Sequence, residues 1–131
     1  MNKEKSCGAI VYNDDKVLLI KHNAGHIAFP KGHVEGNETE EETAYREILE
    51  ETGLETKIDN RFRYVISYSP KPLIMKDVVY FVATVTGGKE KPQLEEVSEV
   101  MWMPMDRAME MITFDNDKKV LANALKYINR K

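Results

Sequence analysis

The sequence predicts an α/β sandwich, and three observations support this prediction. The 131 residues are 42% hydrophobic, which is enough for one core. Short strand-like runs flank a charged segment with helical features, and a second helical pattern lies near the end of the chain. The sequence contains no internal repeat, linker or low-complexity tract. We therefore expect residues 1–131 to form a single domain.

The N-terminal part of the chain predicts a β-hairpin. Two apolar runs, at residues 7–12 and 17–21, have the length and composition of short strands. A polar turn formed by Asn13, Asp14 and Asp15 joins them. The two runs are therefore expected to pair with each other.

The next element is a helix expected to begin near Glu40. Glu42 follows Thr39 at the spacing of a capping box, in which the Thr39 hydroxyl binds one of the first backbone N–H groups of the helix. Gly53 is expected to end this helix, because glycine readily adopts the left-handed conformation that closes a helix C-terminus.

After this helix, β-branched and aromatic runs predict four strands, at residues 55–58, 62–68, 77–86 and 99–103. Gly87 and Gly88 are expected to end the third of them. The chain then turns helical, and apolar residues repeat at helical spacing at Val120, Leu121, Ala124, Leu125 and Ile128. We expect an amphipathic helix from about Asp115 to Asn129.

Composition excludes several classes of protein. The formal net charge is −3 without a dense basic tract, so we expect no stable binding to nucleic acid. Cys7 is the only cysteine, which rules out an internal disulfide and is consistent with a reducing compartment. The chain begins without the apolar stretch of a signal peptide, and no run is long enough to span a membrane. We expect a soluble cytoplasmic protein, and no feature predicts its oligomeric state.

Three glutamates of the central helix suggest a metal site. At about 100° per residue, Glu47, Glu50 and Glu51 fall within one arc of the helix surface. Carboxylates at this spacing repel each other, and clustered oxygen ligands suit hard cations such as magnesium or manganese. The alternative is a solvated acidic face. The preceding loop favours a site, because Gly32 and Gly36 allow its backbone to approach a ligand closely.

The segment from Gly32 to Leu54 resembles the Nudix box. Nine residues fill all its defined positions: Gly32, Glu38, Arg46, Glu47, Ile48, Glu50, Glu51, Gly53 and Leu54. The order of the predicted elements also matches the Nudix fold, in which a mixed β-sheet lies between α-helices. The resemblance implies an enzyme that hydrolyses a nucleoside diphosphate linked to another group, using magnesium or manganese.

The resemblance also implies roles for individual residues. Glu47, Glu50 and Glu51 would bind the metal, together with the backbone carbonyl of Lys31. Arg46 would pair with Glu38 and orient the loop against the helix. For the general base, Glu51 is the first choice by position, because it lies on the metal edge near bound water. Two glutamates of the loop before Trp102 are alternatives: Glu96 and Glu99.

Within the family, the chain is most similar to the asymmetric diadenosine tetraphosphate hydrolases. Three stretches support this similarity: residues 6–10, 30–35 and 76–80. The similarity implies that four residues contact the phosphate chain, namely His26, Lys31, Lys76 and Tyr80, and that Tyr68 stacks on an adenine. Alternatives remain for three of them: Tyr80 as a core residue, His26 as a plain loop residue and Lys76 as a solvated edge lysine.

Two departures concern base recognition rather than the metal edge. Ile27 stands where that group usually has tryptophan, and Gly36-Asn37 replaces its usual proline-glycine pair. Similar loops occur in relatives that cleanse the nucleotide pool by hydrolysing nucleoside triphosphates, so this substrate class is the main alternative. A third hypothesis is a catalytically silent domain that only binds nucleotides.

Overall fold

The computed structural model describes residues 2–130. Its elements in chain order are β1 (Asn2–Asn13), β2 (Lys16–His22), β3 (Ile27–Ala28), β4 (Lys31–His33), α1 (Glu40–Thr52), β5 (Leu54–Lys71), β6 (Ile74–Gly88), β7 (Val97–Pro104), α2 (Met105–Met111) and α3 (Asp115–Ile128). No helix in this part of the chain is long and apolar enough to cross a membrane.

The strands form a mixed sheet, as predicted. β1 pairs in parallel with β6 over ten residues, from Asn2 opposite Ile74 to Val11 opposite Ala83. All other strand pairs are antiparallel, including the expected hairpin of β1 and β2. Because β1 also pairs with β4, the strand that begins at Lys31 lies directly beside the centre of the sheet.

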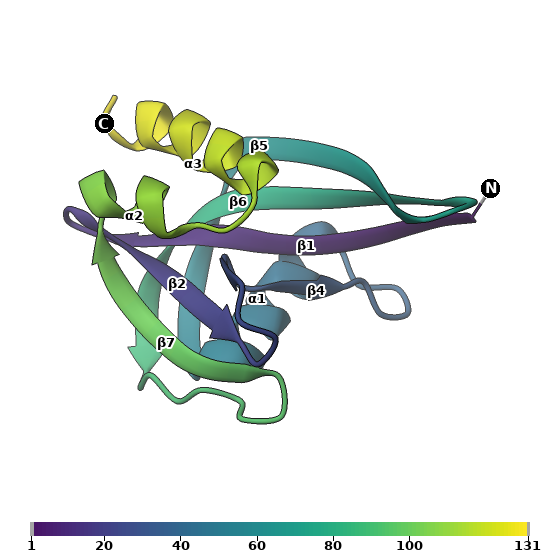
Figure 1. The fold of residues 1–131 in the computed structure, drawn as a ribbon. Coiled ribbons are helices and arrows are strands. Elements are labelled where there is room, and N and C mark those ends of the chain that lie inside the picture. Colours follow the sequence, from purple (N-terminus) through teal and green to yellow (C-terminus); the bar gives the residue numbers. More distant parts are fainter. Residues whose placement is uncertain (1, 131) are drawn as a thin grey trace.

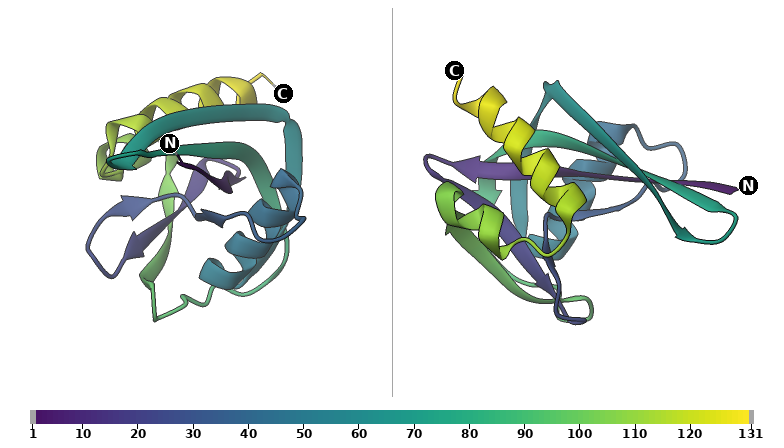
Figure 2. Two further views of the ribbon diagram at one scale, coloured as in Figure 1. Left: turned by 90° about the vertical axis from the view of Figure 1, so that its right-hand side faces the viewer. Right: turned by 45° about the horizontal axis from the view of Figure 1, so that its top comes forward.

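The sheet lies between helices, which confirms the predicted fold class. Figures 1 and 2 show α2 and α3 on one side of the sheet and α1 on the other. Side chains of β6 alternate between the two sides, as the pleat of a strand requires. Val78, Tyr80 and Val82 belong to a core with residues of α2 and α3. Val79 and Phe81 belong to a second core with residues of α1.

The caps of α1 form as the sequence predicts. The Thr39 hydroxyl accepts a hydrogen bond from the Glu42 N–H at 3.1 Å, and the Glu42 carboxylate accepts one from the Thr39 N–H at 2.8 Å. Gly53 closes the C-terminus in the left-handed conformation, with φ of 80°. Both ends of α1 are therefore held by local interactions, which sets the position of its acidic edge along the chain.

Some elements differ from the prediction. The two strands expected at residues 55–58 and 62–68 are one strand, β5, whose pairing with β6 shifts register between Asp59 and Tyr64. The polar residues that suggested a break are accommodated by this irregularity. Three short elements were not predicted, namely β3, β4 and α2. The first two have only two and three residues, too few for a periodic pattern.

Candidate active site

The acidic edge of α1 packs directly against β4. A Cβ atom added to Gly32 would overlap the Glu47 carboxylate, so glycine leaves room for this side chain in the rotamer that pairs with Arg46. Next to it, the backbone N–H of Lys31 donates a 2.8 Å hydrogen bond to Oε1 of Glu51. Gly8 of β1 is also required, because a Cβ there would overlap the Pro30 carbonyl. Gly8 and Gly32 thus allow the Lys31–Gly32 segment to lie close to both the sheet and the carboxylates of α1.

Burial raises the pKa of two carboxylates on the acidic edge, those of Glu47 and Glu51. Glu51 is 2% exposed, and burial raises its pKa to about 8, with a further contribution from the charge of Glu47. Burial also raises the pKa of Glu47 to about 7, although the Arg46 guanidinium acts in the opposite direction. Glu50 lies at the surface, with about half of its side chain exposed. The site therefore favours additional positive charge beside Glu47 and Glu51.

Arg46 joins the loop to the helix, the geometry that its predicted orienting role requires. Its Nε donates to Glu38 at 2.6 Å, and its Nη2 donates to Glu38 at 3.0 Å and to the His33 carbonyl at 2.9 Å. Its Nη1 donates to Glu47 and Glu50, both at 3.2 Å. This two-pronged pairing lowers the pKa of Glu38 to about 2. One side of the guanidinium holds the loop, and the other contacts the acidic edge.

The donor set is suited to a hard divalent cation. Glu47, Glu50 and Glu51 offer carboxylate oxygens, and the Lys31 backbone adjoins them. Among residues 2–130, however, no group of three or more histidine, cysteine or acidic side chains is gathered closely enough to hold a metal ion. Glu47 and Glu50 instead share the Arg46 guanidinium. The residues fit a cation in chemistry and charge, provided that Glu47 and Glu50 turn from Arg46 toward it.

The two loop glutamates proposed as alternative bases lie in different surroundings. The Lys91 N–H donates to the Thr52 carbonyl at 2.7 Å, so the loop before β7 packs on the C-terminal end of α1. Glu96 in this loop is exposed, and its charge raises the pKa of both Glu47 and Glu51. Glu99 is also exposed, but it lies within β7 opposite Lys21. The structure therefore brings Glu96 near the acidic edge and gives no comparable contact for Glu99.

A pocket of about 450 Å³ adjoins Lys31 and contains three of the predicted substrate contacts. Its lining residues are His22, His26, Lys31, Ile66, Tyr68, Val78, Phe114, Asn116 and Asp117. Lys76 does not line the pocket, but it is opposite Tyr68 in the β5–β6 pairing, and burial and the charge of Lys31 lower its pKa. His26, Lys31, Tyr68 and Lys76 are thus brought to one region.

Tyr80 is the exception among the predicted contacts. Its side chain has no exposed surface and packs in the core between the sheet and α3. Its hydroxyl points toward Asp117, with a donor–acceptor distance of 3.4 Å to Oδ1. Direct contact of Tyr80 with a phosphate chain is therefore not supported, because the strand pleat turns this residue inward. Tyr80 is therefore a core residue, which was the alternative to a phosphate contact.

Several pocket residues were missed by sequence reasoning. The His22 and His26 rings stack with centroids 4.0 Å apart, and Phe114 lies against His26 at 5.4 Å. His26 was predicted as a substrate contact, but His22 and Phe114 lie in no recognisable motif and were missed. Asp117 did leave a signal, because it occupies the apolar stripe of α3, three residues before Val120, and is only 4% exposed. An acidic residue on a buried helix face indicates a specific partner.

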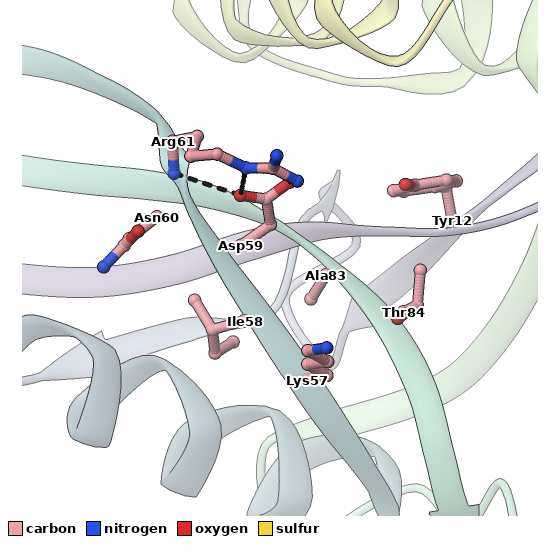
Figure 3. A pocket seen from close by; sticks show the side chains of 8 residues that line it. All are labelled: Tyr12, Lys57, Ile58, Asp59, Asn60, Arg61, Ala83 and Thr84. Atoms are coloured by element: carbon pink, nitrogen blue, oxygen red, sulfur yellow. Dashed lines mark hydrogen bonds and ion pairs between the residues drawn. The ribbon is translucent and has the colours of Figure 1, made fainter. Parts of the chain in front are cut away.

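A second cavity, of about 420 Å³, lies elsewhere on the sheet and contains none of the predicted site residues. Figure 3 shows its lining, where the Arg61 side chain folds back onto Asp59 of the same strand. Lys57 and Thr84 lie across from this pair on β5 and β6. None of its lining residues belongs to the acidic edge or to the pocket beside Lys31.

Comparisons with known proteins show the family and the fold. A family model described as a NUDIX domain matches residues 2–124. An 8-oxo-(d)GTP phosphatase of Mycolicibacterium smegmatis is 39% identical over 99 residues, which cover 76% of this chain but only 30% of that protein. An asymmetrical bis(5'-nucleosyl)-tetraphosphatase of Rattus norvegicus is 29% identical over 142 aligned positions, covering 95% of each chain. The structure of a C. elegans Ap4A hydrolase is similar in fold, with a TM-score of 0.83 and 21% identity over 98% of this chain and 99% of that chain.

Proposed function

We propose that this chain, which belongs to the Nudix hydrolase family, cleaves a phosphoanhydride bond within a nucleotide-derived polyphosphate. One observation supports this most directly. The carboxylates of Glu47 and Glu51 are held against the Lys31–Gly32 backbone, and Lys31 also lines a pocket large enough for a nucleoside. A polyphosphate chain could therefore lie at the acidic edge while its nucleoside occupies the pocket.

The acidic edge would hold magnesium, or manganese, through Glu47, Glu50, Glu51 and the Lys31 carbonyl. When bound, such a cation lowers the pKa of a water molecule and polarises phosphoryl oxygens. Arg46 has a positioning role, since its bonds to Glu38 and the His33 carbonyl hold the loop against α1. Lys31 and Lys76 supply point charges that bind the phosphate chain of the substrate.

We assign the general base to Glu96, with Glu51 as the alternative. A general base must reach the attacking water within hydrogen-bond distance. Glu96 is exposed and close enough to affect the pKa of Glu47 and Glu51, whereas Glu51 is almost fully buried and one of its oxygens already accepts the Lys31 N–H. These surroundings suit Glu51 better to binding a cation and Glu96 to accepting a proton.

A dinucleoside polyphosphate is the proposed substrate, with diadenosine tetraphosphate cleaved to ATP and AMP. The similarity to the Rattus norvegicus tetraphosphatase, which extends over 95% of both chains, supports this choice. The pocket supports it as well, because Tyr68 lines it beside Lys31 and offers an aromatic face to a base. Ile27 packs against the core and does not line the pocket, so the absence of tryptophan there leaves this aromatic surface intact.

A nucleoside triphosphate is the second candidate substrate. The 39% identity to the 8-oxo-(d)GTP phosphatase of Mycolicibacterium smegmatis favours it, and one nucleoside pocket is sufficient for a triphosphate. Both candidates place the scissile bond at the same acidic edge. They differ in which products are released and in whether a second nucleoside contributes to binding.

The proposal is tested by product analysis in magnesium. The purified protein is incubated with diadenosine tetraphosphate, plain and oxidised guanosine triphosphate, and a nucleotide sugar. We expect ATP and AMP from the first, and a far higher rate on oxidised guanosine triphosphate would make the second candidate correct. Affinity for these nucleotides without turnover of any would instead indicate a silent binding domain.

Matched variants test the site itself. Glu51→Gln and Glu96→Gln should each lower kcat by roughly 10²-fold or more, the usual contribution of a metal ligand or a general base. Glu110→Gln makes the same change on the exposed surface of α2 and should leave kcat unaltered. Loss of the acidic limb of the pH–rate profile only in Glu96→Gln would identify Glu96 as the base. Full turnover in Glu51→Gln would contradict the proposed metal edge.

A further inference from the structure

The pocket beside Lys31 has an uncharged aromatic wall. The stacked rings of His22 and His26 form it together with Phe114. Burial lowers the pKa of His22 to about 4 and also lowers the pKa of His26, so the pocket disfavours positive charge on both rings. A neutral flat surface suits the face of a base and offers little attraction to a phosphate. Lys31 is the only lysine or arginine in the lining.

At the end of the pocket that it lines, Asp117 disfavours a phosphate and favours a hydrogen-bond donor. It lines the cavity from the first turn of α3, although only 4% of its surface is exposed. The Tyr80 hydroxyl donates to its Oδ1 at 3.4 Å, and no other side-chain hydrogen bond to Asp117 occurs within residues 2–130. Its second oxygen is therefore available to a ligand. Because this oxygen lines the pocket, a ligand that donates a hydrogen bond to it would replace the water lost from the carboxylate on binding.

We propose that Asp117 reads the amino group of a purine base bound in this pocket, and that Tyr80 positions the Asp117 carboxylate for this contact. The inference rests on the proposed function, because it takes the ligand to be a nucleotide whose phosphates extend toward Lys31. Adenine and guanine both carry an exocyclic amino group that donates hydrogen bonds. The pocket would therefore select amino-bearing purines over analogues that lack this group.

The core position of Tyr80 fits a positioning role. A tyrosine that is fully buried usually finds a partner for its hydroxyl, and here that partner is a pocket residue. The hydroxyl engages Oδ1 and so restricts rotation of the carboxyl group. Tyr80 would then influence the substrate through Asp117, without touching it.

Binding of nucleoside monophosphates tests this inference separately from catalysis, because these ligands contain no phosphoanhydride bond. Two pairs of probes each differ by one amino group: AMP against purine riboside monophosphate, and GMP against IMP. We expect calorimetry to give a dissociation constant roughly 10- to 100-fold lower for the amino-bearing member of at least one pair, as for a hydrogen bond to a charged group. Equal affinities within both pairs would overturn the inference, even if the protein hydrolyses polyphosphates.

Variants then assign the effect to Asp117 and Tyr80. Asp117→Ala removes the acceptor and should reduce the preference to about threefold or less while the affinity for the analogue without the amino group stays the same. The matched control is Asp115→Ala, which changes an exposed acid in the same helical turn and outside the pocket and should keep the full preference. Tyr80→Phe should produce a partial loss of preference, again without changing affinity for the analogue.

Two outcomes would contradict the assignment. If Asp117→Ala folds, as judged by its melting temperature, and keeps the wild-type preference, another residue reads the amino group. If Tyr80→Phe lowers the affinity for both members of a pair equally, Tyr80 has only a structural role. Should Asp117→Ala fail to fold, the probe pairs on the unaltered protein and on Tyr80→Phe still decide the question.

Discussion

Replacing Gly32 with alanine should remove most of the activity while leaving the fold intact. The new Cβ would overlap the Glu47 carboxylate, which lies directly over this glycine. Gly32 itself does not have a positive φ, so alanine can adopt its backbone conformation without strain. The conflict is therefore confined to the side chain of Glu47, one of the proposed metal ligands.

The expected magnitude follows from the size of the displacement. To relieve the overlap, the Glu47 carboxylate must move by more than about 1 Å or turn to another rotamer, and a displacement of this size in a catalytic site costs roughly 10²-fold in rate. The 3.2 Å pair with Arg46 would also weaken. That pair is partly solvated, so its loss should cost no more than about 1 kcal/mol of unfolding free energy, or roughly 4 °C in Tm.

Steady-state kinetics in magnesium and a thermal melt measure these two effects. Gly36→Ala is the matched control: it lies in the same loop, a Cβ there meets no atom within 4 Å, and its φ is 53°. Alanine in that conformation costs about 1 kcal/mol of stability but should leave kcat/KM nearly unchanged. The reasoning is refuted if Gly32→Ala keeps kcat/KM within threefold of the wild type, or if both variants lose activity equally.

Three further predictions concern Arg46, acid stability and metal binding. Arg46→Lys keeps the charge but cannot bond Glu38 through two nitrogens, so kcat/KM should fall at least tenfold and the Tm should decrease. Wild-type kinetics in this variant would contradict the positioning role of Arg46. Arg63, and to a lesser extent Lys5, lower the pKa of Glu40 to about 2 from 4.5. This pairing therefore stabilises the fold above about pH 4.5, and the stabilisation is lost as the pH falls through 2. Glu40→Gln should weaken the dependence of the unfolding free energy on pH between pH 4.5 and pH 2. If the Tm of both proteins falls by the same amount from pH 6 to pH 2, the pairing is disproved. Magnesium at 100 times its dissociation constant should raise the unfolding free energy by about 2.7 kcal/mol, an increase that chelation reverses.

The sequence by itself determined the elements whose causes are local. The capping box of Thr39 and the stop at Gly53 lie within a few residues of the backbone groups they satisfy, so α1 was predicted with its correct ends. The acidic edge follows from the same helical geometry, whereas the pairing of Arg46 with Glu38, a residue that precedes α1, was implied by the resemblance to the Nudix box. An α/β sandwich was also predictable, because the alternation of strands and helices leaves few packing arrangements, and the mixed sheet was implied by the resemblance to the Nudix fold.

The tertiary structure alone decided which distant residues share the pocket. His22, Tyr68 and Asp117 come from β2, β5 and α3, and no spacing in the sequence relates them. It also decided the direction of Tyr80, since a strand pleat leaves two faces open until packing buries one of them. Hydrogen bonds within a helix depend on neighbours in the chain, whereas a pocket depends on how separate elements pack. For this reason the acidic edge could be predicted from the sequence, whereas the places of His22 and Asp117 in the pocket beside Tyr68 could not.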